Sequence, residues 1–322
     1  MENSPISDVQ GINELAKKTA ALKSEISKVI VGQDKVVDQI LTAIFSNGHV
    51  LLVGVPGLAK TLLVNTISKV LGLSFNRIQF TPDLMPGDIT GSEILGEDRS
   101  FKFLKGPVFT NVLLADEINR TPPKTQAALL ESMQEHNVTI AGKSYKLPEP
   151  FFVLATQNPI EQEGTYPLPE AQLDRFMFNV WVDYPSVQEE IQLVQRTTGG
   201  ETANVNKVLK EGDITFFQNL IKKIPVPEPV LEYAVRLVVS TRKGTKNCHE
   251  YTEKYLSWGA GPRASQYLIM GAKTHAALNG KYSVDIEDVK AVALPVLRHR
   301  LILNYHADAE NLKIEDLISA LL

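Results

Sequence analysis

Residues 54–61 constrain the fold of this chain more than any other segment. They read Gly-Val-Pro-Gly-Leu-Ala-Lys-Thr, follow a short aliphatic run at residues 49–53, and precede apolar residues at helical spacing. The aliphatic run predicts a buried parallel strand, and the spacing after the loop predicts a helix. In a strand–loop–helix unit of this kind, the loop amides and the helix N-terminus face one anion. The segment therefore predicts a phosphate-binding loop.

Two side chains of this loop carry the expected chemistry. Lys60 would reach the β and γ phosphates of a nucleotide, and Thr61 would bind Mg²⁺. The loop departs from the G-x-x-x-x-G-K-[ST] pattern at Ala59, where glycine is usual; alanine costs little there if its φ is negative. The residues expected to bind a nucleotide are Gly54, Val55, Pro56, Gly57, Leu58, Ala59, Lys60, Thr61 and Leu62.

A second motif places two carboxylates at the end of an apolar run. Residues 112–117 read Val-Leu-Leu-Ala-Asp-Glu, so Asp116 and Glu117 would lie at the carboxyl edge of a parallel sheet, where such sheets bind ligands. Asp116 would hold Mg²⁺ through water, and Glu117 would orient and deprotonate the attacking water. Such a string is common by itself, but after a phosphate-binding loop it indicates a hydrolytic site.

Three further polar residues have both a catalytic and a structural explanation. Asn158 follows a predicted buried strand at residues 151–156 and would share the attacking water, or it forms a turn before proline. Arg175 precedes the last predicted strand, where an arginine is more often in a surface ion pair unless the fold is a ring. Arg263 starts a predicted helix, an unusual place for a cation without an anion nearby; the alternative is a salt bridge.

Val31 and Gly32 lie between two predicted helices, just before the phosphate-binding strand. Many P-loop ATPases lay a backbone segment along adenine at this point. Gly32 would equally serve a simple helix–helix turn, and the local sequence does not choose between the two.

Two segments predict β-hairpins. Residues 92–103 and 138–147 each place short β-like arms around a polar turn. The first hairpin carries Phe101 and Phe103, which would engage a partner or pack as an insertion; the packed alternative is slightly favoured.

Composition limits the class of protein. Of 322 residues, 43% are hydrophobic and 22% charged, as in a globular chain, and the length suggests two domains. We expect a nucleotide-binding domain at residues 1–200, a linker at 201–226 and a helical domain at 227–322. The formal net charge of −4 gives no general reason to bind nucleic acid. The single cysteine, Cys248, and the absence of long apolar runs or a signal-like N-terminus favour a cytoplasmic protein without a membrane span.

The motifs together resemble the MoxR family of AAA+ ATPases, from about residue 12 to the C-terminus. The resemblance is carried by residues 54–61, by Leu-Ala-Asp-Glu-Ile-Asn-Arg at 114–120, by Ala-Thr-Gln-Asn-Pro at 155–159, and by Pro-Glu-Ala-Gln-Leu-Asp-Arg-Phe at 169–176. It implies an α/β P-loop core, with a parallel sheet flanked by helices, and a smaller all-α C-terminal lid. Ala59 belongs to the family's own form of the loop.

The resemblance also implies a role for each ambiguous element. Asn158 is similar to sensor 1, Arg175 to the arginine finger given to a neighbouring subunit, and Arg263 to sensor 2, which contacts the γ-phosphate from the lid. Val31 and Gly32 resemble the adenine-side segment. The hairpins at 92–103 and 138–147 resemble the helix-2 insert and the pre-sensor-1 hairpin.

The expected function is a chaperone-like ATPase. The resemblance implies ATP and Mg²⁺ as ligands, a ring of identical subunits with six as the expected number, client proteins, and a partner with a von Willebrand A domain. A nucleic-acid motor is the main rival, because the hairpins resemble those of MCM helicases; the acidic net charge opposes it. A small-molecule kinase or a GTPase is a second rival, but residues 206–209 lack the aspartate of the guanine-specifying N-K-x-D motif.

Overall fold

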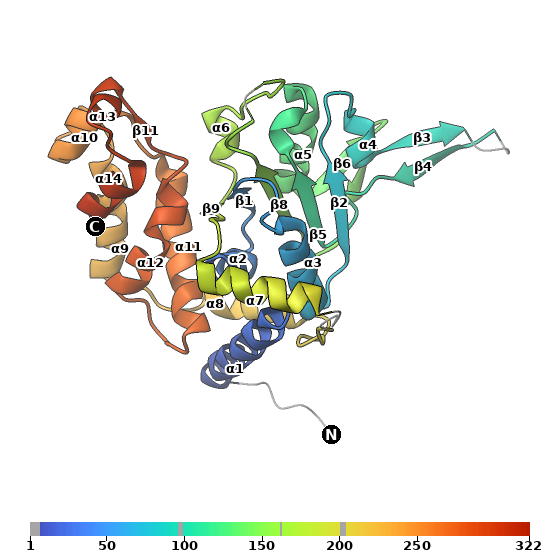
Figure 1. Ribbon diagram of the computed structural model, residues 1–322, viewed down its shortest axis with the longest axis horizontal. Helices are drawn as coiled ribbons and strands as arrows, with labels where there is room; N and C mark the ends of the chain where they lie inside the picture. The colour runs from blue at the N-terminus through green and yellow to red at the C-terminus, as the bar shows by residue number, and fades with distance from the viewer. Residues whose placement is uncertain (1–6, 96–98, 162, 200–203) are drawn as a thin grey trace.

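A computed structural model of the chain describes residues 7–95, 99–161, 163–199 and 204–322. A parallel sheet with flanking helices forms the centre, a mostly helical unit lies beside it, and a two-stranded hairpin projects from the opposite side (Figure 1). Within the described residues, no helix combines the length and the apolar character needed to cross a lipid bilayer.

The central sheet has five parallel strands in the order β2-β5-β8-β1-β9. The strands are short, and the three inner ones are mostly apolar because a parallel sheet is buried on both faces, whereas the edge strand at residues 75–79 reads Phe-Asn-Arg-Ile-Gln and is mostly not buried. The predicted α/β core is therefore confirmed. The strands are β1 (Val50–Val53), β2 (Phe75–Gln79), β5 (Val112–Asp116), β8 (Phe152–Gln157) and β9 (Phe178–Trp181).

Alternate residues of the strands pack into two hydrophobic cores. Leu52 and Leu114 face one core, whereas Leu51 and Leu113 face the other, as the two-residue period of a strand requires. The first core contains residues of α1 (Asp8–Ser27), α2 (Asp34–Phe45) and α3 (Lys60–Leu71), and it continues into the helical unit. The second core is closed by α5 (Pro123–Glu135).

Both predicted hairpins form. The first pairs β3 (Gly91–Leu95) with β4 (Phe101–Lys105), and residues 96–98 at its predicted turn lie outside the described residues. Phe101 is 70% exposed, whereas Phe103 stacks on Tyr145 with ring centroids 4.2 Å apart. The favoured alternative, a packed insertion, is thus right for Phe103 and wrong for Phe101, which is exposed on the projecting part of the hairpin. The second hairpin pairs β6 (Asn137–Ile140) with β7 (Lys143–Lys146).

The segment predicted as a linker, residues 201–226, contains a helix. This helix, α8 (Asp213–Lys222), packs against α1 and α2, and the ring centroid of its buried Phe217 lies 6.3 Å from that of Phe45. The helical unit also includes a two-stranded antiparallel ladder of β10 (Leu256–Trp258) and β11 (Ile302–Leu303), which helical periodicity did not predict. The remaining elements are α4 (Pro86–Thr90), η1 (Ile118–Arg120), α6 (Glu170–Leu173), α7 (Val187–Thr198), α8 (Asp213–Lys222), α9 (Glu228–Ser240), α10 (Glu250–Tyr255), β10 (Leu256–Trp258), α11 (Pro262–Leu278), α12 (Ile286–Leu297), β11 (Ile302–Leu303), α13 (Tyr305–Ala309) and α14 (Ile314–Leu321).

Candidate nucleotide-binding site

The phosphate-binding loop connects the end of β1 to the start of α3, as the sequence predicts. A Cβ atom on Gly54 would lie 2.7 Å from the carbonyl oxygen of Val182, so only glycine fits there. Gly57 has φ 88° and Ala59 has φ 53°. The condition under which alanine would cost little at this position, a negative φ, is therefore not met, and the left-handed conformation costs an alanine about 1–2 kcal/mol. Strain of this kind is typical of ligand-binding loops.

Lys60 lies between the loop and the carboxylates of β5. Its Nζ donates hydrogen bonds to the carbonyl oxygens of Gly54 and Val55. Burial lowers the pKa of Lys60, and the negative charges of Asp116 and Glu117 oppose part of that effect. The cation, the loop amides and the two carboxylates therefore meet at one edge of the sheet.

The turn between α1 and α2 touches the phosphate-binding loop. Gly32 adopts φ 73°, and the Gln33 side-chain amide donates to the Leu58 carbonyl oxygen over 3.2 Å. A Cβ on Gly32 would collide with the Glu189 side chain near the start of α7. Gly32 thus makes the helix–helix turn, and Gln33, the residue after it, contacts the loop. The adenine contact of Val31 and Gly32 stays a prediction.

Asp116 is held by two side chains that sequence reasoning missed. Thr156 Oγ1 donates to Asp116 Oδ1 over 2.6 Å, and Arg77 Nη2 lies 2.6 Å from Asp116 Oδ2. Thr156 is on β8 and Arg77 on β2, the two neighbours of β5 in the sheet. The strand order, which the sequence did not supply, was the missing information.

Glu117 lies directly after β5 in a left-handed conformation, with φ 57°. Its backbone N–H donates to Thr156 Oγ1 over 2.8 Å. Its carboxylate accepts from the Gln79 side-chain amide at 2.7 Å and from Arg120 at 3.2 Å. These contacts hold the carboxylate at the carboxyl edge of the sheet, beside Asp116, where a general base for hydrolysis is expected.

Asn158 follows β8, which pairs directly with β5 as predicted. Its side chain is buried, and its Oδ1 accepts a hydrogen bond from the backbone N–H of Ile160 over 3.2 Å. The turn-forming alternative is therefore correct for this oxygen. Sharing of the attacking water by Asn158 stays a prediction.

Asp116 and Thr61 suit Mg²⁺ chemically. Carboxylate and hydroxyl oxygens are hard ligands, and Mg²⁺ keeps several waters and nucleotide oxygens in its shell. In the part of the chain that the structure describes, no group of three or more His, Cys, Asp or Glu side chains could hold a metal ion by itself. Asp116 and Thr61 thus fit an Mg²⁺ ion whose other ligands are water and the phosphate oxygens of a nucleotide.

Arg175 and Arg263 lie at the opposite edge of the sheet from the loop. Both line a cavity of about 190 Å³ together with His49 and His136. The Met177 backbone N–H donates to the carbonyl oxygen of His49, the residue just before β1, so this cavity faces the amino ends of the strands. Burial lowers the pKa of His49 to about 4, which leaves its ring neutral near pH 7.

Arg263 forms the ion pair that was its structural alternative. Its Nη1 lies 3.1 Å from Asp174 Oδ2, and both side chains are partly exposed. The structure therefore brings Arg263 to Arg175 and not to the phosphate-binding loop of the same chain. Its contact with a γ-phosphate stays a prediction.

Comparison with known proteins matches both parts of the chain. Residues 49–178 match the ATPase family associated with various cellular activities (AAA), and residues 249–321 match the AAA lid domain. The chain is 46% identical to Chaperone MoxR1 of Mycobacterium tuberculosis over 92% of its own length and 79% of that protein. It is 31% identical to Protein MoxR of Methylorubrum extorquens, covering 88% and 87% of the two chains.

A solved structure has the same fold. A crystal structure of a candidate ATPase from Cytophaga hutchinsonii superposes with a TM-score of 0.88 at 42% identity, covering 97% of this chain and 95% of that one. The likeness extends over both the sheet and the helical unit, so the combination of an α/β core and a lid is shown.

Proposed function

The chain belongs to the MoxR family of AAA+ ATPases, and we propose that it hydrolyses ATP at interfaces between identical subunits of a ring. We further propose that the resulting motion remodels client proteins in the cytoplasm. One observation supports the shared site above all others. The arginine expected to assist hydrolysis lies at the opposite edge of the sheet from the loop that would bind ATP.

Distance supports this arrangement. The four residues of β1 separate the two edges by about 13 Å, which is longer than an arginine side chain. Arg175 therefore cannot reach ATP bound to the loop of its own chain in this conformation. Arg175 and Arg263 offer positive charge suited to the phosphates of a neighbouring subunit, and Arg263 shares part of its charge with Asp174 in an ion pair.

The other residues of the site act within one subunit, and each has a separate role in binding or hydrolysis. The amides of residues 54–61 and the Lys60 ammonium would bind the phosphates, while Thr61 and Asp116 would hold Mg²⁺. The ion, when bound, neutralises charge on the phosphate oxygens. Glu117 would take the proton of the attacking water, and Gln79 and Arg120 keep its carboxylate in place.

We expect specific ATPase activity to rise with protein concentration. A site completed by a neighbouring subunit exists only in the assembled ring. Turnover should therefore be lost when the protein concentration falls below the dissociation constant of the ring. Activity and molar mass by light scattering should be measured across the same dilution series. Constant specific activity in a monomeric sample would refute the shared site.

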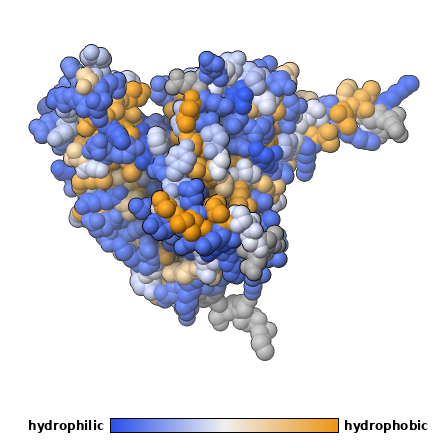
Figure 2. Space-filling view, in the orientation of Figure 1, coloured by the Kyte–Doolittle hydropathy of each residue, from blue (hydrophilic) through white to orange (hydrophobic). Residues whose placement is uncertain are grey.

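The projecting hairpin should serve client proteins and not hydrolysis. Ile94, Leu95, Phe101 and Leu104 are exposed on it, and Figure 2 shows apolar surface along this projection. Exposed apolar patches of this kind mark interaction sites. We propose that clients bind here; a partner with a von Willebrand A domain is also part of the proposal.

Removing the tip of this hairpin, residues 95–101, should leave basal ATPase activity within about twofold and abolish stimulation by reduced, unfolded α-lactalbumin. The reason is that the deletion removes the exposed side chains of Leu95 and Phe101, while β3 and β4 project away from the sheet that carries the phosphate-binding loop (Figure 1). Tyr305→Ala, which removes an exposed aromatic ring from the helical unit, is the matched control and should keep the stimulation. Loss of basal turnover in the deletion would show that the tip is needed for the site itself.

A further inference from the structure

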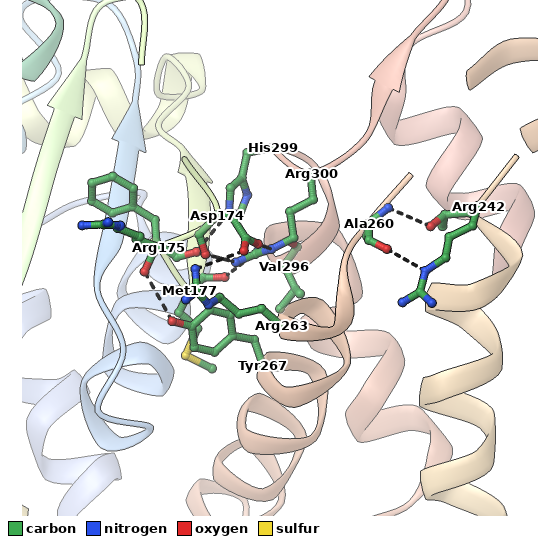
Figure 3. Close-up of polar contacts among 12 residues, drawn as sticks. Asp174, Arg175, Met177, Arg242, Ala260, Arg263, Tyr267, Val296, His299 and Arg300 are labelled. Atoms are coloured by element: carbon green, nitrogen blue, oxygen red, sulfur yellow. Dashed lines mark hydrogen bonds and ion pairs between the residues drawn. The ribbon is translucent and has the colours of Figure 1, made fainter. Parts of the chain in front are cut away.

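The backbone that carries Arg175 is held by the lid. Four consecutive carbonyl oxygens, those of residues 174–177, accept hydrogen bonds from lid side chains (Figure 3). Arg300 donates to the carbonyl oxygens of Asp174 at 2.9 Å, Phe176 at 2.7 Å and Met177 at 3.3 Å. The Tyr267 hydroxyl donates to the Arg175 carbonyl oxygen over 3.3 Å.

Arg300 makes these contacts as a buried cation. Its side chain is 2% exposed, and its Nε donates to Asp174 Oδ1 over 2.7 Å. Its guanidinium also lies 5.1 Å from the centre of the Tyr267 ring. A buried charge is tolerated only when its partners are in place, so Arg300 and the segment at 174–177 fix each other's positions.

The two sides of this network come from different parts of the fold. Residues 174–177 lie between α6 and β9 in the α/β core. Tyr267 and Arg263 are on α11, and Arg300 follows α12, all in the lid. Asp174 joins them, since its carboxylate accepts from both Arg300 and Arg263. The Arg175 side chain extends from the other side of the segment, away from Arg300 (Figure 3).

We propose that Arg300 is a positioning residue for Arg175. By holding the carbonyl oxygens on both sides of Arg175, it sets the direction in which that side chain meets the nucleotide of the next subunit. The position of the lid in one subunit then controls hydrolysis in its neighbour. This inference rests on the proposed function of Arg175 and names the residue that regulates it.

A substitution that keeps the charge tests the geometry. Arg300→Lys retains a cation beside Asp174. The lysine ammonium, however, cannot reproduce the planar guanidinium group, whose N–H donors reach three carbonyl oxygens and a carboxylate. Because a displacement of about 1 Å at a catalytic group costs about 10²-fold, we expect ATPase activity to fall by roughly that factor with unchanged ATP affinity. Tyr267→Phe removes a single donor and should give a smaller loss in the same direction.

Arg242→Lys is the matched control. Arg242 is also an arginine of the lid that donates from Nε to a carbonyl oxygen, that of Ala260, over 3.0 Å (Figure 3). It has no hydrogen bond to residues 174–177 among the contacts described. Its substitution should therefore change thermal stability without the large loss of turnover.

Mixed rings decide where the defect lies. An Arg300→Lys subunit keeps its own Glu117 and lacks a well-placed Arg175. Mixing it with Glu117→Gln subunits should restore activity, because those subunits donate an intact Arg175. Mixing it with Arg175→Ala subunits should restore nothing, because both kinds of subunit then lack a working finger.

The opposite pattern would overturn the proposal. If Arg300 supports only the site of its own subunit, activity should return with Arg175→Ala and not with Glu117→Gln. Failure with both, once subunit exchange is shown, would mean that Arg300 maintains assembly in general, which also refutes the positioning role. The pair Arg175→Ala with Glu117→Gln tests the shared site separately: if that pair also fails, the proposed function itself is refuted.

Discussion

Replacing Arg175 with alanine should leave ATP binding unchanged and lower ATP turnover by roughly 10³- to 10⁵-fold. An arginine that acts in trans neutralises charge that develops on the γ-phosphate in the transition state, so its loss affects the rate and not the ground-state affinity. ATP affinity should be measured by calorimetry and turnover by phosphate release. A surface ion pair would change stability by at most about 1 kcal/mol and leave turnover nearly unchanged.

The mixing experiment distinguishes action in trans from action within one subunit. An Arg175→Ala subunit keeps its Glu117, and a Glu117→Gln subunit keeps its Arg175, so each is inactive alone. In a mixed ring, the second can give its arginine to the first, and partial activity should return in a concentration-dependent way. If subunits exchange and no activity returns, Arg175 is not a shared finger. Arg263, which lines the same cavity, would then be tested next, followed by Arg120.

Lys60→Ala and Glu117→Gln should both abolish hydrolysis, but by different routes. Lys60 is the cation beside the loop carbonyl oxygens, so its removal should weaken ATP binding beyond detection. Glu117 follows the carboxyl end of β5, where its carboxylate accepts hydrogen bonds from Gln79 and Arg120. The Glu117→Gln variant should therefore bind ATP normally but lack the general base. General-base catalysis contributes about 10²- to 10⁴-fold, which sets the expected loss of turnover.

These two variants should be compared by ATP titration and by single-turnover hydrolysis. Glu131→Gln is the matched control, because it makes the same chemical change at an exposed position of α5 and should keep full activity. Equal loss of ATP affinity in the Lys60 and Glu117 variants would contradict the division of roles between them.

Local sequence was sufficient for the elements at the carboxyl edge of the sheet. The aliphatic runs of β1, β5 and β8 are buried on both faces, and the residues that follow each run lie at the edge by covalent continuity. The positions of the phosphate-binding loop, Asp116, Glu117 and Asn158 at the carboxyl ends of these strands were therefore predicted from the chain alone, while their roles stay predictions. Their neighbours Arg77 and Thr156 were not, since pairing between strands depends on the order of the sheet.

The position of the arginines was decided by the tertiary structure alone. The sequence determined that Arg263 begins a helix and that Arg175 precedes a strand, because helical period, proline and strand composition are local signals. It contained no local signal that α11 would pack against residues 174–177, which are distant in the chain. Tyr267 on α11 and Arg300 after α12 meet residues 174–177 only where the core and the lid pack together, and the buried charge of Arg300 is tolerated because that packing supplies its partners.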